Sequence, residues 1–153
     1  MDSFLRMQLD SFEESLRVVR TGYVHCQLKP QAKQSTRWGR GHAHTSKAKR
    51  KYMQELAKQV RQTYNGPLLD GLIRVTVIYS FPWRKKDTSK TRQSGWMLMP
   101  QVPDIDNLLK PFDDSMQGHC YADDSRIVEV RARKMRSDFV CIAARLDEVV
   151  IRG

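Results

Sequence analysis

IRVTVIYSF, residues 73–81, places an apolar side chain at every second position from Ile73 to Phe81. Successive side chains of a β-strand point to opposite faces of a sheet, so this alternation predicts a strand with a buried face. Pro82 follows directly and ends the strand, because proline cannot donate a hydrogen bond to a neighbouring strand. This strand is the centre of the predicted fold, and the other elements are placed around it.

Two further elements are predicted upstream of this strand. Residues 47–64 predict a helix that Ser46 caps and that Asn65-Gly66-Pro67 ends. The apolar face of this helix repeats at helical spacing and comprises Tyr52, Met53, Leu56, Val60 and Tyr64. Residues 17–28 alternate like a strand, and a loop rich in glycine, lysine and arginine leads from there to Thr45.

The first residues of the chain predict a short amphipathic helix. Its apolar stripe follows helical spacing and consists of Leu5, Leu9, Phe12 and Leu16. Acidic side chains interrupt this segment, which argues against a secretory signal peptide.

A long basic loop and a second helix are predicted downstream of the central strand. The loop spans residues 83–103, a length that is usual for functional or mobile segments. The helix covers about 105–117, and its apolar side comprises Ile105, Leu108, Leu109, Phe112 and Met116. Pro111 is expected to kink this helix or to move its start later.

Two strands complete the predicted fold, at about 126–135 and 139–147, with Arg136-Ser137-Asp138 as a hairpin connection between them. Past the N-terminal helix the order is therefore strand, helix, strand, helix, strand, strand. Two helices can cover one face of a single sheet in this order. We expect one α+β domain with a mixed β-sheet, order β-α-β-α-β-β, and both helices packed on one face.

The composition limits the classes of protein to which the chain can belong. The chain has 153 residues, a length typical of one domain, and its 27 lysines and arginines against 17 aspartates and glutamates give a net charge of +10. No run approaches the roughly 18 apolar residues of a membrane span, which excludes a membrane protein. The three cysteines form no C-x-x-C pair, so we expect reduced thiols in a cytoplasmic chain, at least two of them buried.

The positive charge is concentrated in residues 29–51 and 84–92. Basic surface attracts a polyanion because binding releases the counterions of that polyanion, whereas a single basic run is usually solvated surface. The residues predicted to contact DNA are Lys29, Lys33, Arg37, Arg40, Lys47, Lys49, Arg50, Lys51, Arg84, Lys85, Lys86, Lys90 and Arg92. Trp38 and Trp96 lie in or beside these segments, where each could stack on an unpaired base or anchor the core.

The negative charge gathers between residues 104 and 124, where six aspartates accompany one base, Lys110. Asp104 and Asp106 point the same way if the backbone is extended there, and Asp106 shares a helix face with Lys110 if the helix begins by Asp106. The aspartate pair 123–124 follows the helix. It reaches the same place only if the chain folds back along the helix, which the sequence leaves open.

Clustered carboxylates repel a polyanion unless divalent cations neutralise them. Hard oxygen ligands select Mg²⁺ or Mn²⁺ over zinc, and phosphodiester hydrolysis uses such ions to activate water and to stabilise the attacking and leaving oxygens. A nearby lysine can offset charge on the scissile phosphate. The spacing alone leaves two interpretations open: a metal-dependent nuclease, or helix capping with surface solvation.

Other metal and catalytic patterns are absent from the sequence. An EF-hand beginning at Asp104 would need glycine and glutamate where Leu109 and Ser115 stand. There is no H-E-x-x-H, no G-x-S-x-G, no Walker A and no G-x-G-x-x-G motif. His42 and His44 have no third zinc ligand in their loop, so we interpret them as solvated or as positioning DNA.

The strings DIDNLLK (104–110) and YADDS (121–125) resemble the RusA-type Holliday junction resolvases, small endodeoxyribonucleases of phages and bacteria. The loop from Leu28 to Thr45 and the helix start after it resemble the same family, and the likeness covers about residues 22–147. The resemblance implies a homodimer with two active sites that uses Mg²⁺, with Mn²⁺ as a substitute. Such a dimer nicks four-way DNA junctions symmetrically in recombination or repair.

Carried over residue by residue, the resemblance assigns catalysis and metal binding to Asp104, Asp106 and Asp124. Lys110 matches the essential lysine, and Asp114 and Asp123 match further acids that would support the metal ligands. Residues 21–153 would form the nuclease domain and residues 1–20 a helical N-terminal extension. The implied location is the cytoplasm of a bacterial or phage-infected cell, in association with the nucleoid.

Two other functions stay open at this point. One is a catalytically silent DNA- or RNA-binding protein, and the other is a metal nuclease that prefers flaps, forks or RNA. A homodimer needs an apolar seam, for which we favour residues 96–100 over the N-terminal stripe and over the surface near Phe139 and Cys141.

Overall fold

The computed structural model of the chain describes residues 3–4, 15–32, 37–39, 42–44 and 47–153. Its elements in chain order are β1 (Leu16–Cys26), β2 (Arg37–Gly39), β3 (His42–His44), α2 (Lys47–Thr63), β4 (Leu72–Phe81), α3 (Ser89–Arg92), β5 (Trp96–Leu98), α4 (Ile105–Met116), the 3₁₀ helix η1 (Asp124–Arg126), β6 (Ile127–Ser137) and β7 (Cys141–Ile151). Among these described elements, none of the helices is long and apolar enough to span a membrane.

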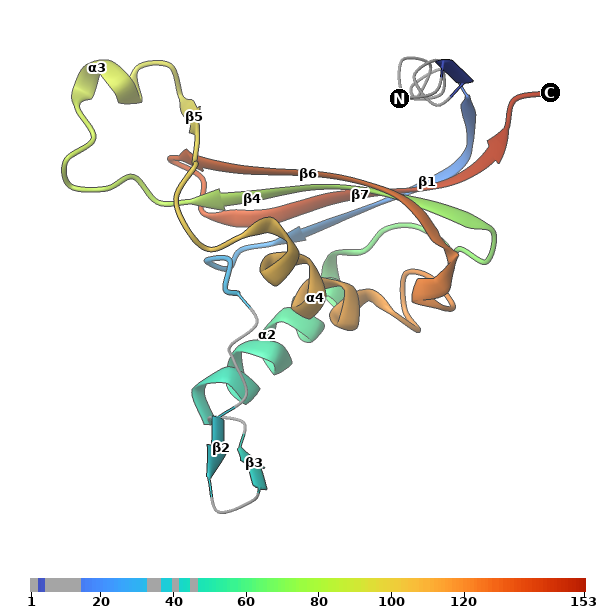
Figure 1. Cartoon of the computed structure of the whole chain (residues 1–153), viewed down its shortest axis with the longest axis horizontal. Helices are drawn as coiled ribbons and strands as arrows, with labels where there is room; N and C mark the ends of the chain where they lie inside the picture. The colour runs from blue at the N-terminus through green and yellow to red at the C-terminus, as the bar shows by residue number, and fades with distance from the viewer. Residues whose placement is uncertain (1–2, 5–14, 33–36, 40–41, 45–46) are drawn as a thin grey trace.

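Five strands form a mixed sheet in the order β1-β7-β4-β6-β5, so β4 lies at its centre. β4 runs parallel to β6 and antiparallel to β7, and the outer strands β1 and β5 are antiparallel to their neighbours. Helices α2 and α4 lie on the same face of this sheet, in contact with each other, and α2 also contacts β1 (Figure 1). The predicted α+β class is therefore confirmed.

β6 and β7 follow each other in the chain without pairing, because β4 lies between them. Tyr79 of β4 stands opposite Lys134 of β6 on one side and Ile142 of β7 on the other. The predicted hairpin at 136–138 is therefore wrong: Ser137 still belongs to β6, and residues 138–140 lead across to the far side of β4. Alternation within a strand sets its buried face but does not specify which strand becomes its neighbour.

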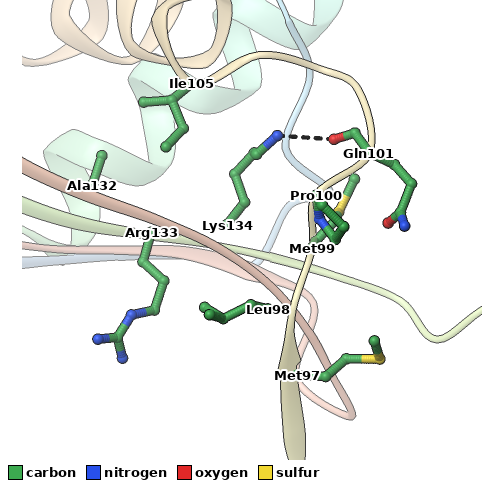
Figure 2. Close-up of a pocket in the computed structure, with 9 residues that line it drawn as sticks. All are labelled: Met97, Leu98, Met99, Pro100, Gln101, Ile105, Ala132, Arg133 and Lys134. Carbon is green, nitrogen blue, oxygen red and sulfur yellow. Dashed lines mark hydrogen bonds between the residues drawn. The ribbon is translucent and has the colours of Figure 1, made fainter.

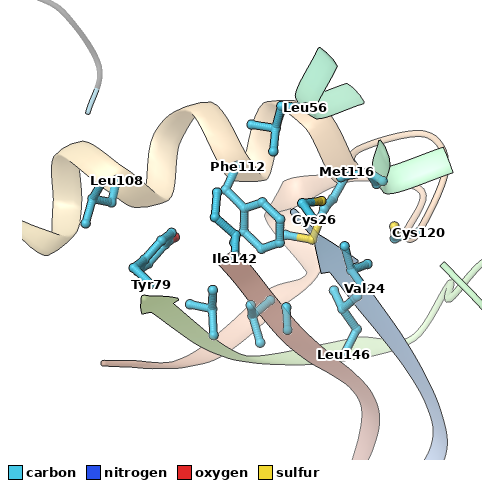
Figure 3. Packing of buried hydrophobic residues seen from close by; sticks show 14 of the residues in the cluster. Val24, Cys26, Leu56, Tyr79, Leu108, Phe112, Met116, Cys120, Ile142 and Leu146 are labelled. Atoms are coloured by element: carbon cyan, nitrogen blue, oxygen red, sulfur yellow. The ribbon is translucent and has the colours of Figure 1, made fainter. Parts of the chain in front are cut away.

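The core lies between the sheet and the two long helices. Every second residue of β4 from Ile73 to Phe81 is buried, as the alternation predicts. The helices add Leu56, Val60, Leu108, Phe112 and Met116 to the same cluster (Figure 3). Phe112 meets Tyr79 edge to face, with ring centroids 6.3 Å apart, which fixes α4 over the middle of the sheet.

Two of the three free thiols are part of this core. Cys26 and Cys120 are fully buried, whereas Cys141 is half-buried. Burial raises the pKa of Cys26 and the pKa of Cys120 to about 12, so both stay protonated and pack as small apolar groups. The prediction of at least two buried cysteines is confirmed.

Several boundaries differ from the predicted ones. The predicted loops hold short elements, α3 and β5 in residues 83–103 and the β2–β3 pair before Thr45, which are too short for periodicity to reveal. Leu16 belongs to β1, and the rest of the N-terminal stripe, Leu5, Leu9 and Phe12, lies outside the described residues. α4 begins at Ile105 and accommodates Pro111, so the proline does not move the helix start later.

The sheet face opposite the helices carries a buried ion-pair network. Arg74 of β4 lies between Asp147 of β7, at 3.2 Å, and Glu129 of β6, at 3.6 Å. All three residues are less than a tenth exposed, and Thr21 donates a further bond of 2.8 Å to Asp147. The second face of the central strand therefore carries buried charge pairing at Arg74, although Thr76 and Ile78 further along the same face are only half-buried.

Candidate active site

Asp104 and Asp106 open helix α4. Asp104 is the N-cap residue with an extended backbone (ψ 151°), and its side chain makes no capping hydrogen bond. Asp106 lies in the first turn, and both side chains are exposed. Carboxylates suit this position because the helix dipole is positive here. Both groups keep their oxygens available for a ligand.

Lys110 and Asp114 form an ion pair further along α4, with Nζ and Oδ1 3.0 Å apart and both side chains about half exposed. The hydrogen bond from Lys110 to Asp114 raises the pKa of the lysine, and the charges of Asp124 and Asp113 raise it further. The ammonium is therefore within the electrostatic reach of three carboxylates. One of these, Asp124, comes from beyond the end of the helix.

A turn after α4 brings Asp124 back to the helix. Gly118 has φ +81°, a conformation that L side chains rarely adopt, and its N–H donates to the Tyr121 carbonyl at 2.8 Å. Tyr121 is fully buried, and its hydroxyl donates to the backbone oxygen of Asp113 at 3.1 Å. Leu69 accepts a backbone bond from Ala122 and holds the turn from the other side. This is the return along the helix that the sequence leaves open.

Asp113 belongs to the same cluster and is missing from the sequence-based site. Its side chain is half-buried, and its Oδ1 atom is enclosed without a hydrogen-bond partner. Burial, followed by the charge of Asp114, raises the pKa of Asp113 to about 6. Its spacing of seven residues from Asp106 and three from Lys110 is the signal that could have placed it on their helix face.

The two members of the 123–124 aspartate pair have different roles. Asp123 is the N-cap of η1, and its carboxylate accepts the Ser125 N–H at 2.9 Å. This backbone hydrogen bond lowers the pKa of Asp123. Asp124 starts η1 and is exposed. Asp123 therefore shapes the turn, while the charge of Asp124 contributes to raising the pKa of Lys110 on α4.

The donor chemistry of this surface fits a hard divalent cation. Asp104, Asp106 and Asp124 offer exposed carboxylates. The enclosed Oδ1 atom of Asp113 has no hydrogen-bond partner, and a bound cation could compensate for this. In the part of the chain that the structure describes, no three His, Cys, Asp or Glu side chains already stand close enough to hold one ion. The carboxylates would have to turn toward a shared ion, and the ligand set stays a prediction.

Basic residues of α2 reach the same region. Lys47, Arg50 and Lys51 are exposed on its first turns. Lys49 lines a cavity of about 170 Å³ between α2 and α4, together with Lys110 and Asp114. Of the remaining predicted DNA contacts in this half of the chain, Lys29 is exposed, Arg37 lies in β2, and Lys33 and Arg40 lie outside the described residues.

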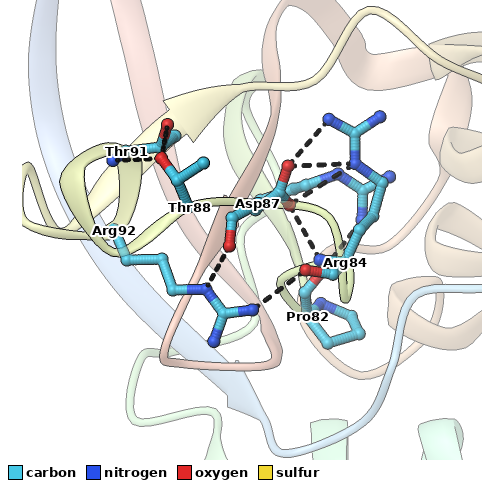
Figure 4. Close-up of polar contacts among 7 residues, drawn as sticks. Pro82, Arg84, Asp87, Thr88, Thr91 and Arg92 are labelled. Carbon is cyan, nitrogen blue, oxygen red and sulfur yellow. Dashed lines mark hydrogen bonds and ion pairs between the residues drawn. The ribbon is translucent and has the colours of Figure 1, made fainter.

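The second basic segment is a folded loop (Figure 4). Asp87 accepts hydrogen bonds from the backbone N–H and the guanidinium of Arg84, at 2.8 and 2.9 Å, which lower the pKa of Asp87. Arg92 donates to the backbone oxygens of Asp87 and Arg84 at 3.2 and 2.9 Å. These two arginines hold the loop together. The exposed cations on it are Arg92, Lys85, Lys86 and Lys90, and in this loop, all of which the structure describes, only the first of these four uses its side chain for a hydrogen bond.

Comparison with known proteins gives one result that bears on this site. A family model described as Endodeoxyribonuclease RusA matches residues 27–143. The match includes both basic segments, all of α4 and the 123–124 aspartate pair. No curated protein matches the chain.

Proposed function

Because the chain belongs to the RusA endodeoxyribonuclease family, we propose that it is a Mg²⁺-dependent endonuclease that resolves four-way DNA junctions by paired, symmetric cuts. The family is one of Holliday junction resolvase nucleases, so DNA is the substrate class of this enzyme. One relationship carries the finer proposal: the turn after α4, anchored by the bond from the Tyr121 hydroxyl to the Asp113 backbone oxygen, brings the charge of Asp124 near enough to raise the pKa of Lys110. Both halves of the D-x-D-N-x-x-K and D-D pattern thereby share one surface.

Asp104, Asp106 and Asp124 would hold the metal, with Mn²⁺ able to replace Mg²⁺. The bound ion supplies an activated water and stabilises the oxygens that attack and leave the phosphorus. Lys110 offsets the charge that develops on the scissile phosphate, since its ammonium is exposed beside the carboxylates. Asp114 orients that ammonium, and Asp123 fixes the turn that carries Asp124.

The basic residues are proposed to bind the phosphate backbone on either side of the acidic cluster. On α2 these are the exposed cations of the first turns, and on the folded loop they are Lys85, Lys86 and Lys90. Arg84 and Arg92 take part indirectly, because their guanidinium groups are already bonded within the loop. In this arrangement, DNA would meet negative charge only at the aspartates, which is the same place where the metal would bind.

We also propose a homodimer, with residues 21–153 as the nuclease domain and residues 1–20 as an extension whose last residues, from Leu16 on, pair with β7 as part of β1. Paired cuts in a junction of two-fold symmetry require two active sites. Within the favoured seam, Trp96 and Leu98 are exposed, at 44% and 60%, whereas Met99 is buried in the core. β5 is an edge strand, so its unpaired edge and these two side chains would form the dimer interface. The proposed location is the cytoplasm, on the nucleoid.

The test is cleavage of labelled DNA by the purified protein with Mg²⁺. The substrates are a four-way junction, a flap, a fork, an RNA hairpin and a matched linear duplex, and sedimentation of the same sample gives the oligomeric state. We expect paired nicks in the junction and no cleavage of the duplex. Binding to every substrate without cleavage would indicate a catalytically silent binding protein. Faster cleavage of flaps, forks or RNA would indicate a nuclease with another preference.

A further inference from the structure

Lys134 of β6 reaches across a cleft to the segment that leads into α4. Its Nζ atom donates to the backbone oxygen of Gln101 at 2.8 Å and to that of Pro103 at 2.9 Å. Figure 2 shows the side chain pointing from the strand to this segment, whereas the neighbouring Arg133 points away from it. The two bonds tie residues 101–103 to strand β6 of the sheet.

The carbonyl of Pro103 belongs to the peptide bond that continues into Asp104. The second bond of Lys134 therefore ends one residue before the first aspartate of the site. Asp104 makes no capping hydrogen bond of its own, so its orientation depends on the backbone that delivers it. A backbone hydrogen bond also connects the strand to this segment, because the Lys134 carbonyl accepts the Met99 N–H at 3.1 Å.

The cleft beside these bonds explains why the segment needs such support. It has a volume of about 550 Å³ and is lined by residues 97–101, by Ile105 and by residues 132–134 of β6. A segment that spans a cleft has little packing on that side to fix its position. Charge-assisted hydrogen bonds from one ammonium to two carbonyls are stronger than neutral ones and supply that restraint.

We propose that Lys134 is a positioning residue for the metal-binding aspartates at the start of α4. The inference rests on the proposed function of Asp104 and Asp106 as ion ligands. Lys134 itself touches neither the ion nor the DNA: it holds the backbone of residues 101–103 so that the two carboxylates are presented together. Groups that orient metal ligands in this way typically change metal affinity by about 10–100-fold when they are removed.

Three variants test this assignment. Lys134→Met keeps the length of the side chain but cannot donate, and Lys134→Arg keeps the charge and the donors. Lys58→Met removes the same charge from an exposed position on α2, outside the lining of the cleft, and is the matched control. For each protein we would measure hydrogen exchange of peptides over residues 101–109, Mn²⁺ affinity by titration of the metal-free protein, and junction affinity in EDTA.

We expect Lys134→Met to exchange at least about 10-fold faster over residues 101–109 and to bind Mn²⁺ roughly 10-fold more weakly or worse. Exchange in α2 and junction affinity in EDTA should match those of the wild type. Lys134→Arg should recover much of both losses, and Lys58→Met should show neither.

Wild-type exchange and wild-type Mn²⁺ affinity in Lys134→Met would overturn the inference. So would a general loss of folding or of junction affinity in both Lys134 variants, because that pattern indicates a merely structural lysine. A wild-type protein that cuts no branched DNA with Mg²⁺ would instead contradict the proposed function. The exchange and Mn²⁺ measurements separate the two failures, since neither depends on cleavage.

Discussion

Nζ of Lys110 lies 3.0 Å from Oδ1 of Asp114, one helical turn further along α4, in an ion pair that is about half exposed on both sides. Asp124 comes within the electrostatic reach of the same ammonium although it lies outside the helix. An exposed pair of this kind contributes little to folding, so replacing Lys110 tests its proposed role in the reaction with little effect on stability. The first prediction follows from this geometry.

Lys110→Met should nearly abolish junction cleavage while leaving the fold and the junction affinity in EDTA unchanged within about 2-fold. The reason is that the ammonium acts on charge that exists chiefly in the transition state. Single-turnover cleavage and a DNA titration measure the two effects. Asp114→Asn is the control, because it breaks the ion pair but keeps the ammonium, and it should cleave far better than Lys110→Met. Wild-type cleavage by Lys110→Met would show that the pair is only a surface contact.

Asp106→Asn should reduce cleavage by several orders of magnitude, since it keeps the side-chain volume and removes an anionic ligand. Junction binding should persist or tighten, because one repulsive charge is lost. Asp104→Asn and Asp124→Asn should behave in the same way if the three carboxylates share the metal. Cleavage assays at increasing Mn²⁺ concentration check this, and undiminished cleavage by all three variants would refute the assigned ligands.

Arg74→Met should destabilise the protein by about 3–5 kcal/mol, because it leaves the buried carboxylates of Asp147 and Glu129 without their shared partner. Urea unfolding followed by circular dichroism measures the change in the free energy of unfolding. Arg145→Met is the matched control: Arg145 also pairs with Asp147, at 3.1 Å, but its side chain is 41% exposed, so about 1 kcal/mol or less is expected. Equal effects of the two variants would contradict this account of the network.

Because of Asp113, the free energy of unfolding of the metal-free protein should decrease as the pH rises from about 4 to about 6. Burial raises the pKa of its carboxyl to about 6 in the folded state, so the folded protein binds this proton more tightly than the unfolded chain. Asp113→Asn should remove this dependence. At pH 7 it should be more stable than the wild type by about 1 kcal/mol, a value reduced for solvent screening of a half-buried group. Urea unfolding at pH 5 and 7 in EDTA measures both, and identical pH profiles would contradict the prediction.

Replacing Lys85 and Lys86 by alanine should weaken binding to junction and duplex alike. If each lysine neutralises one phosphate, the slope of log affinity against log salt should fall by nearly 2. Titrations at several salt concentrations give that slope. The control is Lys58→Ala with Arg61→Ala, which removes the same charge from exposed positions on α2. An unchanged slope for the loop variant would place Lys85 and Lys86 away from DNA.

The main elements could be predicted from the sequence because their periodicity is long enough. β4, α2 and α4 were placed to within one or two residues, and the buried positions of β4 were identified. The neighbours of β4 could not be predicted, since strand pairing depends on the whole sheet and not on the pattern within β6 or β7. Elements of three or four residues, such as β5 and α3, contain less than one full repeat of any pattern.

For the site as well, residues within one motif could be predicted from the sequence, whereas contacts between distant segments could not. Asp104, Asp106 and Lys110 occur in one continuous motif, so their common helix could be expected. The approach of Asp124 depends on the Gly118 turn and on the buried ring of Tyr121, which are tertiary features. Asp113 was missed because its half-burial follows from how α4 packs, and spacing alone does not distinguish it from an exposed carboxylate.

The position of β7 has a consequence for synthesis on the ribosome. β7 (Cys141–Ile151) pairs with both β1 and β4. β1 therefore has no partner strand until β7 has been synthesised. Until β7 has left the exit tunnel, β1 and one edge of β4 present unpaired backbone groups that can associate with other chains. We therefore expect the sheet to close only after β7 has left the exit tunnel. Nascent chains that terminate before Cys141 should aggregate or be degraded instead of yielding a smaller nuclease.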